Sequence, residues 1–264
     1  MLGLLHGLGL GAVLYGCLLL VAVITLPILW RPRWVARVTR FVADRAVPVA
    51  LWAGGVKVEV RGVERARELA ATRGYMVIAN HASNLDPLAL MKVMGRTDLA
   101  FVAKAETLRR PVLGRLLRAV GWFGVERESP VSFKRFQEEV AARRKAGWVP
   151  DLVVFPEGTR SVDGTLQPFR MGAFLLAARC RLPILPVVIR GASPLHRRNA
   201  FACYPGVVRV DVLPPIEPPA KLSAADLVAQ VGAMQKQAEE LFRGVDLNQV
   251  DGELPELEPS SVTA

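Results

Sequence analysis

The N-terminal fifty residues carry two apolar patterns, one after the other. From Gly7 to Trp30 the chain has no charged residue. A helix over this run, rising about 1.5 Å per residue, would be roughly 36 Å long and could cross a hydrocarbon core of about 30 Å. From Trp34 to Trp52 apolar residues are interleaved with arginines, a pattern typical of a basic amphipathic helix among membrane headgroups. Residues 1–53 are therefore predicted to attach the protein to a membrane, either as a spanning helix plus an interfacial helix or as two helices that dip into one leaflet.

After Val56 the pattern changes to short β-branched runs that alternate with helical stretches. The runs predict strands at Val56–Val60, Tyr75–Ala79, Leu99–Ala103, Leu152–Phe155, Ile184–Ile189 and Val207–Leu213. Helical spacing predicts helices at Asp86–Met94, Val131–Lys145, Arg170–Cys180 and Ser223–Phe242. Strands that alternate with helices favour an α/β fold with a mostly parallel central sheet covered by helices.

The length of 264 residues and the lack of a visible repeat predict one main domain with terminal attachments. We assign 1–53 to the N-terminal membrane segment, 54–245 to the domain and 246–264 to an acidic, proline-containing tail. The tail has few large apolar residues, so we expect it to be disordered.

The formal net charge of +10 predicts an anionic partner, which by composition alone could be nucleic acid, an anionic membrane or a phosphorylated small substrate. Arginines follow the N-terminal apolar run rather than precede it, so the positive-inside rule places the domain on the cytoplasmic side of the cell inner membrane. The three cysteines and three histidines lack metal-ligand spacing and predict neither a disulfide framework nor a metal site.

His81 and Asp86 form the candidate catalytic pair. His81 follows the predicted strand Tyr75–Ala79, and Asp86 comes five residues later, directly before Pro87. Residues i and i+5 do not share a helix face, so the two side chains can meet only across a turn. An aspartate N-cap with proline at the first helical position would supply that turn. A histidine beside a carboxylate suits general-base catalysis near neutral pH; the alternative is that Asp86 only caps the helix and His81 is an ordinary loop residue.

A second cluster, Phe155–Ser161, continues directly from the predicted strand that begins at Leu152. Loops at strand ends are where α/β sheets usually hold their ligands. Gly158 allows close approach of the backbone, Thr159 supplies a hydroxyl, and Arg160 offers a fixed fork of donors suited to phosphate. The alternative is a polar turn in which Arg160 is solvated.

Three further segments give weaker signals. Gly121–Arg127 is β-like and ends in an arginine that could bind phosphate, although Glu126 beside it could form an ion pair instead. Leu182–Val188 has prolines around a buried-looking run, which could line an apolar groove or belong to the core. Between Leu108 and Val120 apolar residues alternate with arginines, which predicts an amphipathic helix either on a membrane surface or on the protein's own core.

In this order the segments resemble the motifs of the 1-acyl-sn-glycerol-3-phosphate acyltransferases, the PlsC-like lysophospholipid acyltransferases. Asn80–Asp86 matches the family's Asn-His-x4-Asp motif, and Phe155–Ser161 matches its Phe-Pro-Glu-Gly-Thr-Arg-Ser motif in full. Gly121–Arg127 and Leu182–Val187 match its two less specific motifs. The resemblance covers roughly residues 56–213.

The resemblance implies that a fatty acyl group is moved from acyl-CoA or acyl-ACP to the sn-2 hydroxyl of lysophosphatidic acid, which gives phosphatidic acid in phospholipid biosynthesis. It implies His81 as the base and Asp86 as the residue that orients its ring. The residues implied to bind the substrate are Arg127, Glu157, Gly158, Thr159 and Arg160. The expected partners are the lyso-lipid, the thioester co-substrate and the bilayer, with no nucleic acid, no bound cofactor and no metal.

Two other functions stay open from the sequence. The same chemistry could act on another acceptor, such as a lyso-ornithine lipid or another lysophospholipid. Alternatively, the chain could be a membrane-attached lipid-binding protein without catalysis, although the intact His81 and Asp86 pair speaks against that.

Overall fold

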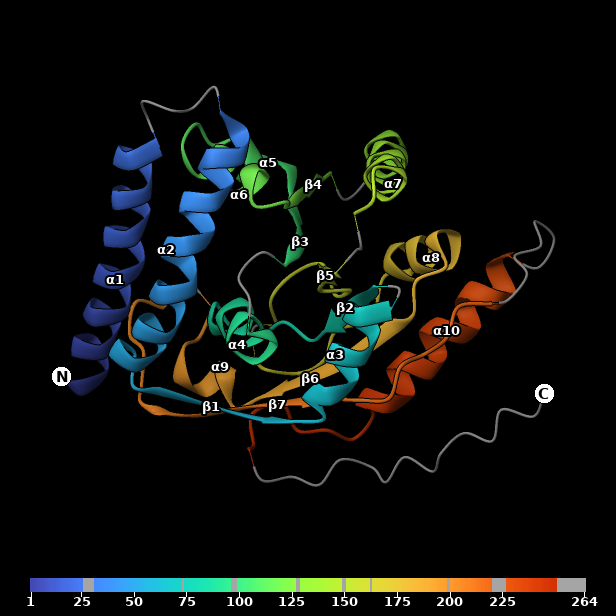
Figure 1. Cartoon of the computed structure of the whole chain (residues 1–264). Coiled ribbons are helices and arrows are strands. Elements are labelled where there is room, and N and C mark those ends of the chain that lie inside the picture. Colours follow the sequence, from blue (N-terminus) through green and yellow to red (C-terminus); the bar gives the residue numbers. More distant parts are fainter. Residues whose placement is uncertain are drawn as a thin grey trace.

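A seven-stranded sheet forms the centre of the fold (Figure 1). The computed structural model describes residues 1–25, 31–72, 74–95, 99–126, 129–148, 151–161, 163–198, 200–219 and 227–250. Its strands are β1 (Val56–Arg61), β2 (Tyr75–Ala79), β3 (Ala100–Lys104), β4 (Phe123–Val125), β5 (Asp151–Val154), β6 (Ile184–Arg190) and β7 (Gly206–Val212). The spatial order is β1-β7-β6-β2-β5-β3-β4, and every pair is parallel except β6 with β7. The predicted α/β class with a mostly parallel sheet is confirmed.

Helices cover both faces of the sheet. The helices of the domain are α3 (Val63–Thr72), α4 (Leu85–Met94), α5 (Ala105–Arg109), α6 (Leu113–Ala119), α7 (Pro130–Lys145), α8 (Met171–Cys180), α9 (Ala192–Leu195) and α10 (Leu227–Phe242). Side chains of β2 alternate between two cores: Val77 packs with residues of α4 and α9, whereas Met76 packs with residues of α7, α8 and α10. All five residues of β2 are buried, as expected for a parallel strand covered on both faces.

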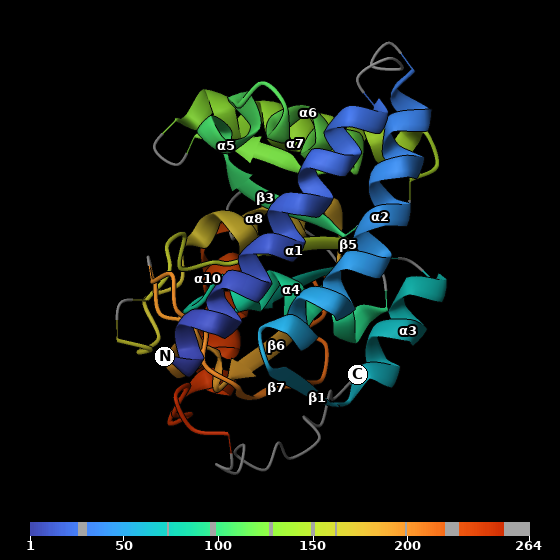
Figure 2. The same ribbon diagram turned by 90° about the vertical axis from the view of Figure 1, so that its left-hand side faces the viewer.

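Helices α1 (Leu2–Thr25) and α2 (Pro32–Ala53) lie side by side along one edge of the molecule (Figures 1 and 2). By length and composition α1 could cross a membrane. It contacts the domain near both of its ends: the Gly3 carbonyl accepts a hydrogen bond from the Cys203 amide at 3.0 Å, and Val21 packs with Val35 and Leu116. The helix therefore lies along the domain and contacts it near both ends.

The predicted amphipathic helix between Leu108 and Val120 is wrong as one continuous element. The structure has the two short helices α5 and α6, separated by a break at Arg110 and Pro111. Arg110 is extended, with φ −60° and ψ 133°, because a residue that precedes proline is disfavoured in the helical conformation. Leu108, Leu116 and Val120 are buried, so these apolar residues pack on the protein itself.

Other differences are local. The sequence did not predict α3, and it treated the region of β4 only as β-like. The described part of the last helix begins at Leu227. Its predicted N-cap, Ser223, lies outside the described residues, and so does the tail from residue 251 onward. The division into 1–53, 54–245 and 246–264 stays a prediction.

A buried ion pair joins the only two antiparallel neighbours among the described strands. Arg190 on β6 donates from Nη2 to Oδ2 of Asp211 on β7 at 2.8 Å, and both residues are 1% exposed. Breaking a buried ion pair by removing one of its two residues typically costs about 3–5 kcal/mol.

We therefore expect Asp211→Ala to lower the free energy of unfolding by about 3–5 kcal/mol, because Arg190 keeps its charge without the carboxylate. A matched control is Glu138→Ala, which removes a carboxylate from the exposed Lys134–Glu138 pair and should cost about 0.5 kcal/mol or less. Denaturant unfolding of both variants in detergent measures the difference. Equal stabilities of the two variants would contradict the importance of the buried pair.

Candidate active site

The candidate site lies at the carboxyl ends of β2 and β5, which are parallel neighbours in the sheet. The chain leaves β2 toward His81 and leaves β5 toward Phe155, so the two motif segments emerge next to each other. A cavity of about 530 Å³ opens there, lined among others by His81, Asn84, Lys104, Thr159, Arg160 and Arg198. The sheet therefore brings together two motifs that are far apart in the sequence.

His81 and Asp86 are in direct contact. Nδ1 of His81 lies 2.7 Å from Oδ2 of Asp86, which is fully buried. The same Oδ2 accepts the backbone N–H groups of Ala82 and Ser83, each at 2.8 Å. Because this carboxylate oxygen is an acceptor for all three, we assign the proton of the neutral ring to Nδ1, which leaves Nε2 with a free lone pair.

The helix boundary differs from the prediction. Helix α4 begins at Leu85, and Asn84 rather than Asp86 occupies its N-cap position. Asp86 is therefore the second helical residue, and its side chain folds back onto the preceding turn instead of capping the helix. The predicted contact across a turn is present, whereas the predicted capping role is wrong because the carboxylate is used by Ala82, Ser83 and the His81 ring.

The segment that follows β5 holds His81 from three sides. Glu157 Oε1 accepts the His81 N–H at 2.6 Å, and the Ser161 N–H donates to the His81 carbonyl at 2.8 Å. The imidazole stacks on Phe155 with ring centroids 4.0 Å apart and an angle of 16° between the planes. Both the backbone and the ring plane of His81 are thereby fixed.

Neighbouring residues of the same loop are anchored as well. The Asn80 side-chain amide donates to the Ile189 carbonyl and accepts its N–H, both at 2.8 Å, which ties the end of β2 to β6. The Ser83 hydroxyl donates to the main-chain carbonyl of His196 at 2.7 Å. These contacts anchor the loop that carries His81 to β6 and to the residues after α9.

Glu157 lies behind His81 and not in the cavity. It is 3% exposed, and its second oxygen accepts the N–H of Gln167 at 2.9 Å. Burial raises the pKa of Glu157 to about 7, and the two backbone N–H groups oppose that rise. This placement argues against the predicted contact with substrate and favours a role in positioning His81.

The other predicted binding residues face the cavity. Gly158, Thr159 and Arg160 line it, and Nη1 of Arg160 donates to Oδ1 of Asn84 at 2.6 Å, which orients the guanidinium. Gly158 has φ +70°, and a Cβ there would lie 3.0 Å from Nε of Arg170, so glycine suits this turn on both counts. Arg127 lies outside the described residues.

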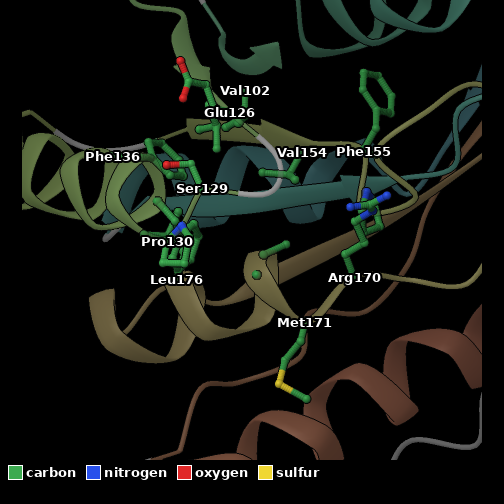
Figure 3. A pocket seen from close by; sticks show the side chains of 16 residues that line it. Val102, Glu126, Ser129, Pro130, Phe136, Val154, Phe155, Arg170, Met171 and Leu176 are labelled. Carbon is green, nitrogen blue, oxygen red and sulfur yellow. The ribbon is translucent and has the colours of Figure 1, made fainter. Parts of the chain in front are cut away.

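A second, more apolar cavity of about 580 Å³ adjoins the first. Figure 3 shows it with Phe155 and Arg170 on one side and Ser129, Pro130 and Phe136 on the other. Five residues line both cavities: Val102, Val125, Val154, Phe155 and Gly158. The apolar cavity therefore begins at Phe155, the residue on which the His81 ring stacks.

The sequence did not single out several residues that build the site. Asn80 and Phe155 belong to the two strongest motifs, and membership in these motifs could have marked them as site residues. Gln167 and Arg198 lie in irregular segments without periodicity or motif, and only the fold brings them close.

The chain is similar to known acyltransferases. The acyltransferase family model matches residues 57–190. The 1-acyl-sn-glycerol-3-phosphate acyltransferase of Limnanthes alba is 33% identical over 168 residues, which are 64% of this chain and 57% of the plant protein. The alpha form of that enzyme from Mus musculus is 31% identical over 199 residues, 75% of this chain and 68% of the mouse protein. The match to the plant relative thus spans less than two thirds of that protein.

A solved structure has the same fold. The crystal structure of the 1-acyl-sn-glycerophosphate (LPA) acyltransferase PlsC from Thermotoga maritima superposes with a TM-score of 0.67. The match covers 91% of this chain and 96% of that chain at 23% sequence identity.

The raised pKa of Glu157 has a consequence for stability. The folded protein binds the proton of Glu157 more tightly than the unfolded chain does. The stabilisation of the folded state by this proton is therefore complete below pH 4.5 and is lost as the pH rises through about 7. The loss is on the order of 3 kcal/mol. Glu157→Gln has no group to titrate, so we expect its unfolding free energy to fall less than that of the wild type over this range. Parallel curves from denaturant unfolding at several pH values would contradict the assignment.

Proposed function

The chain belongs to the 1-acyl-sn-glycerol-3-phosphate acyltransferase family, and we propose that it moves a fatty acyl group from a thioester donor to the sn-2 hydroxyl of lysophosphatidic acid, giving phosphatidic acid. The observation that carries the proposal is the imidazole of His81, which is fixed through Nδ1 by Asp86 and lines a cavity that Arg160 also lines. A base and a phosphate-binding group thus share one space.

In the proposed reaction, Nε2 of His81 accepts the proton of the acceptor hydroxyl while that oxygen attacks the thioester carbonyl carbon. The carbon–sulfur bond then breaks, and the departing thiolate takes the proton back from Nε2. Asp86 stabilises the imidazolium that exists between these steps, because its carboxylate contacts Nδ1. The acyl group passes directly to the acceptor and no acyl-enzyme is formed.

The phosphate of the acceptor is assigned to the side of the cavity formed by the segment after β5. Arg160 supplies charge-assisted donors there, and Asn84 holds its guanidinium in place. Thr159 adds a hydroxyl beside it. This leaves the glycerol hydroxyl to reach His81.

The acyl chain of the donor is assigned to the apolar cavity between α7 and α8. Sites for small molecules are mostly apolar with a few polar groups that fix orientation. This cavity has that character, and it shares lining residues with the cavity of His81, which supports an acyl chain in the one and its thioester carbon in the other. The donor itself is acyl-CoA or acyl-ACP.

Attachment to the inner membrane, with the domain on the cytoplasmic side, is assigned to α1 and α2. Large apolar side chains on both helices are exposed, among them Leu8, Leu19, Trp34, Phe41 and Trp52. The guanidinium of Arg37 lies 5.3 Å from the Trp34 ring centre and that of Arg45 lies 3.6 Å from the Phe41 ring centre, an arrangement suited to a headgroup boundary. The contacts of α1 with the domain favour helices that dip into one leaflet.

Removal of the base should abolish turnover. In His81→Ala we expect acyl transfer to lysophosphatidic acid to fall by about 10²–10⁴, because general-base catalysis is lost. Glu138→Ala, on the exposed side of α7, is the control and should keep its activity. Transfer is measured with labelled acyl-CoA and with acyl-ACP in vesicles. Wild-type turnover in His81→Ala would refute the mechanism, and product formed only with other lysophospholipids would refute the acceptor.

Filling the apolar cavity should shorten the preferred acyl chain. A Cβ on Gly172 would lie 3.5 Å from the Phe133 ring, so Gly172→Leu extends into the space lined by these residues. Gly232→Leu, in α10, is the control, because no atom lies within 4 Å of its added Cβ. In a competition among acyl-CoA donors of different length, we expect only Gly172→Leu to shift toward shorter chains. Identical profiles for the two variants would place the acyl chain elsewhere.

A further inference from the structure

The ionisable side chains that line the catalytic cavity give it a positive potential. Among the described residues of this lining the cations are Lys104, Arg160 and Arg198, beside the neutral imidazole of His81, and none is aspartate or glutamate. The carboxylates of Asp86 and Glu157 are buried behind the lining and are engaged by N–H groups. Such a cavity is complementary to an anion with more than one negative charge.

Arg198 lies next to Arg160 within this lining. Its Nη1 donates to the main-chain carbonyl of Arg160 at 3.1 Å. Burial and the positive charge of Arg198 both lower the pKa of Arg160, although a guanidinium stays charged at neutral pH. Two like charges held side by side repel each other, and an anion bound between them would remove that repulsion.

The segment that carries Arg198 is held on both sides of it. The His196 carbonyl accepts the Ser83 hydroxyl, and the His196 ring lies 3.1 Å from the Ala202 carbonyl. Cys203, a few residues later, donates its N–H to the Gly3 carbonyl of α1. The position of Arg198 is therefore set by the catalytic loop and by the N-terminal helix, although no motif marks it.

We propose that Arg198 binds the phosphate monoester of the acceptor together with Arg160, and that it selects this headgroup over zwitterionic lyso-lipids. This rests on the proposed function. A monoester phosphate carries close to two negative charges and three terminal oxygens, so it can accept from two guanidinium groups at once. A phosphodiester that bears an ammonium group has one negative charge and brings a cation toward Lys104 and Arg198.

The test compares Arg198→Gln with Arg197→Gln. Arg197 is also exposed and is not among the residues that line the cavity, so both variants lose one positive charge near the same place. We expect Arg198→Gln to raise KM for lysophosphatidic acid by about 10-fold or more, the usual effect of losing a charge-assisted hydrogen bond. KM for the thioester should stay unchanged, preference over lysophosphatidylcholine should fall, and Arg198→Lys should restore part of the affinity.

A binding measurement separates this inference from the proposed function. A lysophosphatidic acid analogue that lacks the sn-2 hydroxyl cannot be acylated, and its affinity is measured by titration of the full-length protein in detergent. Weaker binding to Arg198→Gln than to Arg197→Gln supports the phosphate contact even if no turnover occurs. Equal affinities of the two variants overturn it even if the wild type makes phosphatidic acid. A protein that binds the analogue through Arg198 but transfers no acyl group would refute only the proposed reaction.

Discussion

The buried carboxylate of Asp86 is the constraint on which the site depends. One of its oxygens accepts the Ala82 and Ser83 N–H groups and also contacts the His81 ring, so a single side chain closes the turn after β2 and orients the imidazole. An ion without these donors would be costly at a position that is fully buried. The hydrogen bonds that compensate the burial of Asp86 therefore also shape the loop and orient the His81 ring.

The sheet adds a second constraint that no local turn can supply. Because β2 and β5 are parallel neighbours, the segments beyond their carboxyl ends meet, and Glu157 and Ser161 reach the His81 peptide from the adjacent strand. Asn80 makes the corresponding link to Ile189 of β6 on the other side. His81 is thus held between the segment that follows β5 and a loop residue, Asn80, that is bonded to β6.

Sequence reasoning succeeded where a residue's environment follows from a repeating pattern. Doubly buried strands read as continuous apolar runs, and the two strong motifs located His81 and Arg160.

Sequence reasoning failed where one residue interrupts a helix or where a residue's role depends on tertiary contacts. Pro111 splits a helix that periodicity alone would continue. A glutamate in a motif can bind a ligand or can be buried and accept backbone N–H groups. Only the hydrogen bonds of Glu157 in the structure show that it does the latter. Arg198 lies beyond the short helix α9, at a position that no motif or periodicity marks, and it lines the cavity.

The hydrogen bond between Gly3 and Cys203 makes α1 part of the packed structure of the domain. Next to Cys203, the Ala202 carbonyl lies 3.1 Å from the His196 ring. The His196 carbonyl accepts the Ser83 hydroxyl, and the Ser83 amide donates to Asp86. A chain of contacts therefore connects α1 with the carboxylate that orients the His81 ring. A change that moves α1 away from the domain would thus act on the surroundings of His81 through these hydrogen bonds, without having to break the sheet.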